Sequence, residues 1–327
     1  MDIHDRHGLY RTAKDRLASC DPSARQLNLL HAAAVLLLTL ILSIADDLLE
    51  NAIASTGGLG GMANRSILTT VQSCLRLLPI IVLPFWQMGY TYVTMGLARG
   101  NALEKRDLTM GLRRFGPVLR LQLLQTIVYL IPAFLSTQIG TYLFMLTPWA
   151  KPMMQAFTEM MYSDSAVLSD ASLLAMEDGM VPLMIFWAAV FLLLAAPLYY
   201  RFRVADYVLL DNQPCKARTA MRTSSRMMRG NRLTLLKLDL HFWWFYVLDL
   251  LVSAVGYVDV LLLGLGVILP FDTMTAYYLT FAIYAVCQIF LYHWRRNEVS
   301  AAYVLFYDAL RQENAPQPTT PKQPWSY

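Results

Sequence analysis

Charged side chains are scarce in this chain of 327 residues, because Asp, Glu, Lys and Arg together make up only 15% of it. A typical soluble domain contains about 25% charged residues. Hydrophobic residues account for 56%, and the mean hydropathy is +0.41. This composition excludes an ordinary soluble domain. It predicts an all-α membrane protein with several spanning helices.

Cysteines and the signatures of catalysis are also few. The four cysteines show no CxxC spacing, so neither a disulfide framework nor a zinc site is indicated. The five histidines show no HExxH spacing, and no GxSxG, Walker or dinucleotide-binding motif occurs. We therefore expect no catalytic residue, no bound metal and no cofactor, and a protein that is not an enzyme.

Apolar runs long enough to cross a bilayer as helices recur along the chain. They predict a polytopic bundle of about six transmembrane helices, at residues 28–48, 77–97, 119–146, 181–200, 238–256 and 274–293. Residues 1–311 are expected to form one integral membrane domain, followed by a disordered, proline-rich cytoplasmic tail at 312–327. The short apolar stretch at 257–270 is left open between a re-entrant segment, a kink and an extra crossing.

Lys and Arg alternate between high and low numbers in the connections between these runs. Five precede the first run; the following loops contain two, six, one, nine and none, and the segment after the last run contains four. Cytoplasmic loops are enriched in Lys and Arg. The alternation therefore predicts six spans with both termini in the cytoplasm.

The most basic connection, residues 211–230, predicts an amphipathic helix. Asp211 or Asn212 can cap it, and Pro214 suits its first turn and Gly230 its C-terminal end. At 100° per residue, four arginines fall within an arc of about 80°: Arg218, Arg222, Arg226 and Arg229. Small and apolar side chains occupy much of the opposite side: Ala217, Ala220, Met221, Met227 and Met228.

Two interpretations of this helix stay open, and they are compatible. In the first, it lies in the membrane interface with its apolar side at the acyl boundary and its arginines bound to anionic phospholipid. In the second, the arginines only determine topology and the apolar side packs on the bundle. Nucleic acid is not expected as a partner, because no aromatic residues are interleaved with the arginines. Protein partners cannot be named from the sequence.

Polar residues within the predicted spans are costly and therefore informative. Asp249 lies about 15 Å deeper along its helix than Asp239, which is close to the cytoplasmic interface. Gln87, Gln122 and Gln125 are expected in the same interior. A polar contact between helices is one interpretation of Asp249, and a proton-linked or substrate-linked site is the other.

Three segments resemble a known family. The segment VADYVLLDNQPCKARTAMRTSSRMMRGNRLTLLKLDLHFWWF, residues 204–245, resembles the signature of a family of bacterial multi-pass membrane proteins called the domain of unknown function 975 family. The matching positions include Asp211, Asn212, Pro214, Gly230 and Asp239. Residues 96–116 resemble the family's earlier Arg-Gly element, and residues 300–310 its closing Phe-Tyr element. The resemblance implies a bacterial cytoplasmic (inner) membrane protein but brings no activity, substrate or cofactor.

Two classes of function follow from the sequence. A non-catalytic integral membrane protein would act through lipid or protein contacts, which the basic amphipathic helix favours. A small transporter or permease would use Asp249 as an intramembrane acidic site. A weak internal similarity between residues 99–130 and 211–244, each a basic helix, a glycine and a span, is consistent with the transporter but also with similar topology alone.

Overall fold

The computed structural model describes residues 5–18, 24–55, 62–101, 103–162, 170–212, 214–258, 262 and 273–314, and all regular structure within these ranges is helical. Five helices are long and apolar enough to cross a membrane: Ala24–Ser55, Arg65–Ala98, Phe115–Met145, Asp178–Asp211 and Thr275–Glu313. A bent pair, Arg232–His241 and Trp243–Val255, brings the number to six if it forms one span. The predicted all-α helical bundle is therefore confirmed.

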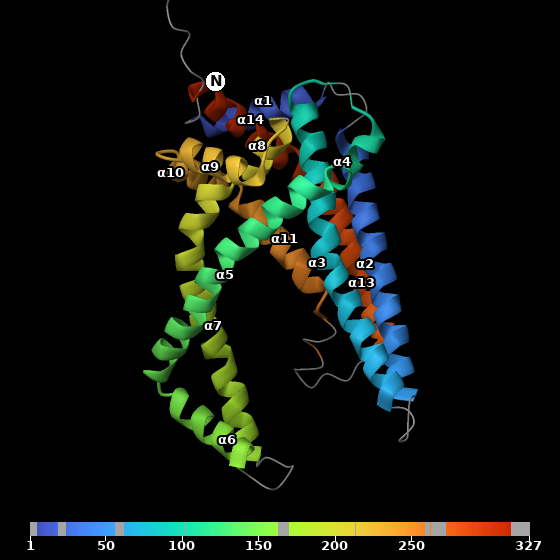
Figure 1. The fold of residues 1–327 in the computed structure, drawn as a ribbon, viewed down its shortest axis with the longest axis vertical. Helices are drawn as coiled ribbons and strands as arrows, with labels where there is room; N and C mark the ends of the chain where they lie inside the picture. Colours follow the sequence, from blue (N-terminus) through green and yellow to red (C-terminus); the bar gives the residue numbers. More distant parts are fainter. Residues whose placement is uncertain are drawn as a thin grey trace, which may run out of the picture. The chain divides into compact units, whose positions relative to one another are not determined.

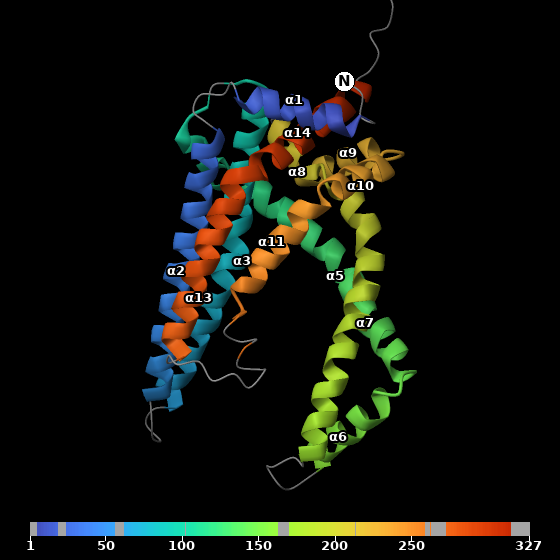
Figure 2. The ribbon, with the colours of Figure 1, turned by 180° about the vertical axis from the view of Figure 1, so that it is seen from behind.

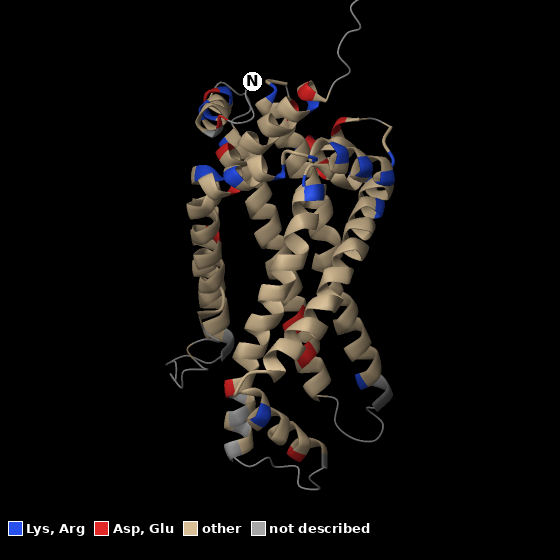
Figure 3. Cartoon of the chain, turned by 90° about the vertical axis from the view of Figure 1, so that its left-hand side faces the viewer, with Lys and Arg blue, Asp and Glu red and all other residues tan. Residues whose placement is uncertain are grey.

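The chain packs as two compact units, which are described separately. Unit 1 comprises Met1–Leu119, Asp206–Lys216 and Gly230–Tyr327, and unit 2 comprises Arg120–Ala205 and Ala217–Arg229. In each unit, Figure 3 shows most Lys and Arg near one end of the long helices, with long uncharged stretches along them.

Unit 1 is built around three long helices that run side by side, namely α2 (Ala24–Ser55), α3 (Met62–Ala98) and α13 (Thr273–Leu291) (Figures 1 and 2). Around them lie the shorter elements α1 (Arg6–Ala18), η2 (Lys105–Thr109), α4 (Met110–Arg113), α8 (Ala205–Asp211), α10 (Arg232–His241), α11 (Trp243–Val255), η3 (Tyr292–Arg296) and α14 (Asn297–Glu313).

The long helices of unit 1 have the character of membrane spans. Pro79 and Pro84 lie inside α3, where an exposed helix in water would lose about 3 kcal/mol per proline, whereas membrane helices tolerate such residues. Only 6% of the most apolar window of α3 is buried inside the protein. Large apolar side chains such as Leu48 and Ile80 therefore point outward, which suits helices surrounded by lipid.

The core of unit 1 sits at one end of the bundle, around α14. Eleven of its 17 residues are buried, including Tyr303 and Tyr307. α14 lies beside α1 in both views, and it also contacts α3 (Figures 1 and 2). The segment at 300–310, which carried part of the family resemblance, is therefore the central helix of this core.

Close backbone packing joins α3 to the connection that follows it. A Cβ atom added at Gly89 would lie 1.7 Å from the carbonyl oxygen of Leu108, and one at Gly111 would lie 1.9 Å from that of Phe85. Real Cβ contacts are never this short, so only glycine fits at either position. The basic connection at 99–114 is thereby held directly against α3.

Unit 2 contains α5 from residue 120 onward (α5 is Phe115–Met145), α6 (Ala150–Tyr162), α7 (Asp170–Phe202) and α9 (Ala217–Met227). The Nε1 atom of Trp187 in α7 donates to the Thr141 hydroxyl in α5 over 2.9 Å. α6 follows α5 after a short turn and packs on α7 through Ala150 and Leu183. The short helix α6 is therefore anchored to α7.

One predicted span has a different shape from the one expected. The run at 238–256 falls on two helices, α10 and α11, which are bent by 61° at a break. Phe242 occupies the break, and its buried ring packs close to Tyr10 and Tyr303. Tertiary packing of this aromatic residue, which hydropathy cannot reveal, accompanies the bend. The predicted tail beyond Asn314 and most of residues 257–270 lie outside the described residues.

Candidate functional site

A cluster of charged side chains joins three helices of unit 1. Arg99 lies in the turn after α3, just before Gly100, whose φ of +75° is one that side chains rarely allow. Its Nη1 atom donates to Oδ1 of Asp211 over 2.7 Å, at the end of α8. Its Nε and Nη2 atoms donate to the carboxylate of Asp308 in α14, over 3.1 and 2.5 Å. The guanidinium thus bridges two carboxylates from separate helices.

Asp211 is the most enclosed member of this cluster, with 9% of its side chain exposed. Besides Arg99, it accepts hydrogen bonds from the Tyr307 hydroxyl at 3.0 Å and from Nη1 of Arg311 at 2.7 Å. Two arginines therefore balance two aspartates. Hydrogen bonding to Asp308 raises the pKa of Arg99 above its ordinary value despite the opposing effect of burial, so Arg99 stays charged at any physiological pH.

The predicted cap at the start of the arginine helix is wrong. Asp211 is the last residue of α8, and the arginine helix α9 begins only at Ala217. Pro214 precedes that helix rather than occupying its first turn. The physical reason is that the Asp211 carboxylate is already bound by two arginines and a tyrosine. Gly230 has a φ of +92° just beyond α9, as expected for a glycine near a helix end.

The three segments of the family resemblance meet in this cluster. Arg99 belongs to the segment 96–116, Asp211 to 204–245, and Tyr307 and Asp308 to 300–310. Their contacts lie within unit 1. In the sequence, Arg99 and Arg311 are only two of the basic residues that alternate between the connections, and no spacing motif singles out Asp308. Residues this far apart along the chain give no local signal of contact.

Asp239, the other acidic residue of the signature, lies in a second polar group. The Tyr303 hydroxyl donates to Oδ1 of Asp239 over 2.5 Å, and the hydroxyls of Tyr303 and Tyr246 are 2.6 Å apart. Tyr303 is buried, and it comes from α14. Both signature acids are therefore bound by residues of the same helix.

Two of the predicted intramembrane polar residues, Asp249 and Gln87, have separate partners. Asp249 accepts a hydrogen bond from Nε2 of Gln288 over 3.2 Å, which joins α11 to α13. Gln87 accepts one from Nη2 of Arg296 over 3.0 Å. Gln122 and Gln125 belong to unit 2. Within unit 1, Gln87 and Asp249 thus form two different contacts rather than one shared group.

The four predicted headgroup-binding arginines share one outward face of unit 2. Arg218, Arg222, Arg226 and Arg229 are all exposed, and none forms an ion pair with a described residue. The hydroxyl of Ser224 donates to the carbonyl of Arg201 over 3.0 Å, and Nε of Arg201 donates to the Ser225 hydroxyl over 2.7 Å. These bonds fix α9 against the end of α7.

The opposite side of α9 is covered by protein, because Ala217, Ala220, Met221, Met227 and Met228 are all buried. The prediction that this side inserts at the acyl boundary is therefore wrong. The apolar side of the helix packs on protein, as the second interpretation expected. The reason is that contact with protein removes these alanine and methionine side chains from water just as contact with lipid would.

Within the described residues, five helices are long and apolar enough to cross a membrane, or six if the bent pair forms one span. The chain belongs to the family described as Protein of unknown function (DUF975), whose model matches residues 20–314. No curated protein and no solved structure matches the chain. The family assignment confirms the predicted resemblance.

Proposed function

We propose that this chain is a non-catalytic integral protein of the bacterial cytoplasmic membrane, with both termini in the cytoplasm, and that α9 binds anionic phospholipid headgroups there. The observation that carries the proposal is the fixed orientation of α9. Arg218, Arg222 and Arg226 on α9 and Arg229 just beyond its end are exposed, while the other side of α9 is buried.

The physical basis is electrostatic attraction to the negative cytoplasmic leaflet. Each basic residue near such a surface gains about 1 kcal/mol, and the attraction decays within a Debye length. The gain requires cations that are not already neutralised, and the four arginines have no ion-pair partner among the described residues. Because Ser224 and Ser225 hold α9 on Arg201, the backbone that carries the arginines need not be ordered when lipid binds.

The test uses the full-length protein reconstituted with spin-labelled lipids, because an isolated peptide would expose the apolar side that the protein covers. Electron spin resonance measures the fraction of each labelled lipid that is immobilised at the protein. We expect the wild type to select phosphatidylglycerol over phosphatidylcholine. The change of Arg218, Arg222, Arg226 and Arg229 to glutamine should remove most of this preference, and raised salt should weaken it.

The matched control replaces the same four arginines with lysine, which preserves the charge. This variant should keep the preference if attraction to the headgroup is mainly a matter of charge. Equal selectivity of the wild type and the glutamine variant, with no effect of salt, would overturn the proposal and leave the arginines as topology determinants.

A small transporter is the second candidate, and a specific pair of observations favours it. The helices α10 and α11 meet at a break where the chain bends by 61°. Transporters form their sites at such broken helices. Asp249 and Gln288 pair within the apolar part of α11 and α13. The Asp249→Asn variant should fold normally and lose transport or phenotype if the carboxylate titrates. If the pair is only a structural contact, Asp249→Asn should be mild and Asp249→Leu should cost on the order of 1 kcal/mol.

A further inference from the structure

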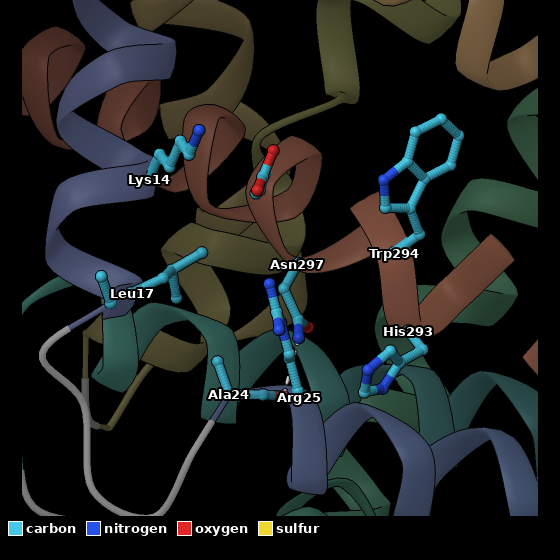
Figure 4. A pocket seen from close by; sticks show the side chains of 9 residues that line it. Lys14, Leu17, Ala24, Arg25, His293, Trp294 and Asn297 are labelled. Atoms are coloured by element: carbon cyan, nitrogen blue, oxygen red, sulfur yellow. Dashed lines mark hydrogen bonds between the residues drawn. The ribbon is translucent and has the colours of Figure 1, made fainter. Parts of the chain in front are cut away.

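A cavity of about 340 Å³ opens in unit 1 where three segments approach each other. It is lined by the end of α1, the start of α2, and the junction of η3 with α14. Figure 4 shows Lys14, Arg25, His293 and Trp294 arranged around it. Pockets for small ligands begin at about 300 Å³, so this cavity is large enough for a headgroup-sized molecule.

Two cations of the cavity wall are not neutralised. Lys14 and Arg25 are exposed, and neither forms an ion pair with a described residue. The single carboxylate of the described wall, Glu298, is already occupied. It accepts a hydrogen bond from Nη1 of Arg295 over 2.6 Å and another from the hydroxyl of Tyr10.

The Tyr10 hydroxyl remains a neutral donor to Glu298. Burial, together with the bond to Glu298, raises the pKa of Tyr10 to about 12. Because Arg295 balances Glu298, the wall keeps the uncompensated positive charge of Lys14 and Arg25. A cavity with this charge selects an anion.

A further polar atom of the wall has no partner. Nδ1 of His293 is buried and forms no hydrogen bond within the described part of the chain. His293 belongs to the π-helical turn Tyr292–Arg296, a rare geometry that is frequent at functional sites. The neighbouring Asn297 already donates to the carbonyl of Ala24 and accepts from Tyr90. His293 therefore lines the cavity with a nitrogen that no described residue hydrogen-bonds.

The cavity lies where apolar helices end. Arg25 is the second residue of α2, and Trp294 follows α13 by three residues and is exposed. Tryptophan and basic residues gather at the membrane interface, at the depth of lipid headgroups. An anion at this depth is available as the phosphate of a phospholipid.

We propose that this cavity binds one phosphate group, supplied by an anionic phospholipid headgroup, with Lys14 and Arg25 as its counter-charges and His293 as a hydrogen-bonding partner. The site goes beyond the proposed role of α9. It lies in unit 1, whereas α9 lies in unit 2, so the two can fail separately.

The experiment is native mass spectrometry of the purified full-length protein in detergent, titrated with phosphatidylglycerol, phosphatidylcholine or glycerol 3-phosphate. We expect one tightly bound phosphatidylglycerol. The double change of Lys14→Gln and Arg25→Gln should weaken its binding at least about tenfold, given two cations near one phosphate. Changing Arg222→Gln and Arg226→Gln on α9 should leave this one lipid bound.

The outcomes separate the possible sources of the phosphate. Tight binding of glycerol 3-phosphate that depends on Lys14 and Arg25 would overturn the lipid source and assign the site to a soluble phosphate ester. Equal phosphatidylglycerol affinity in the wild type and the pocket variant would overturn the site itself. If the double variant does not fold, the single Lys14→Gln variant and the effect of salt on the wild type decide the question, since binding unaffected by both contradicts the proposal.

Discussion

Arg99 donates a hydrogen bond to Asp211 across 2.7 Å, although 112 residues separate them in the chain. The same guanidinium also binds Asp308, 209 residues away. This arginine therefore ties the end of α3 to the end of α8 and to the central helix α14. The family's three segments of resemblance meet in unit 1 through these bonds.

Removing the Arg99 guanidinium should destabilise the protein more than removing an exposed one. Loss of one partner of a buried pair costs about 3–5 kcal/mol, and 24% exposure of the Arg99 side chain reduces this. We expect Arg99→Gln to lower the free energy of unfolding by about 2 kcal/mol, measured by denaturant unfolding in detergent. The free energy of unfolding of Arg99→Lys should lie between those of Arg99→Gln and the wild type. Lysine keeps the charge, but it has no planar fork of donors to bridge two carboxylates.

Arg106 provides the matched control for Arg99. It pairs with Glu104, but both side chains are largely exposed, and such pairs contribute little. Arg106→Gln should therefore leave the unfolding midpoint unchanged. Equal effects of Arg99→Gln and Arg106→Gln would show that the bridge at Arg99 does not hold the helices together.

The packing of α3 against the η2 connection predicts a glycine-specific effect. In Gly89→Ala, the new methyl group would meet the backbone oxygen of Leu108 at 1.7 Å, which forces the backbones apart. Overpacking of this kind typically lowers the free energy of unfolding by about 1–3 kcal/mol. Denaturant unfolding of the purified protein measures this loss. Gly116→Ala, where nothing lies within 4 Å of the new Cβ, should be neutral or slightly stabilising.

The Tyr303 hydroxyl should contribute measurably to the core. Tyr303→Phe removes its hydrogen bonds to Asp239 and Tyr246 and leaves a carboxylate short of a donor. We expect a loss of about 1–2 kcal/mol in denaturant unfolding. Tyr257→Phe, at a ring that is 67% exposed, should have no effect. A Tyr303→Phe variant as stable as the Tyr257→Phe variant would contradict this role.

The long helices could be predicted from the sequence because hydropathy is a local property. The predicted spans at 28–48, 77–97 and 181–200 each fall within one helix that extends beyond the apolar run, as at Ala24–Ser55. The bend at Phe242 could not be predicted, because it accompanies aromatic packing on residues far away in the chain.

The candidate sites show the same difference between features that the local sequence indicates and features that depend on distant residues. The arginine face of α9 follows from helical periodicity within 12 residues, so it was predictable. The partners of Asp211 and Asp239 were not, because they come from α14 and from the turn after α3, and a single sequence contains no record of such long-range pairs. The burial of the apolar side of α9 is likewise a tertiary outcome, since periodicity indicates an apolar side but not whether lipid or protein covers it.

The proposed function depends on α9 facing the cytoplasm, and cysteine labelling tests this most directly. With the four native cysteines changed to serine, single cysteines are introduced by Thr219→Cys in α9 and by Ser66→Cys near the start of α3, both exposed positions. In spheroplasts, an impermeant maleimide should label the Ser66→Cys protein at once. It should label the Thr219→Cys protein only after permeabilisation. Labelling of Thr219→Cys in intact spheroplasts would place the arginines outside and contradict their role at the anionic cytoplasmic leaflet.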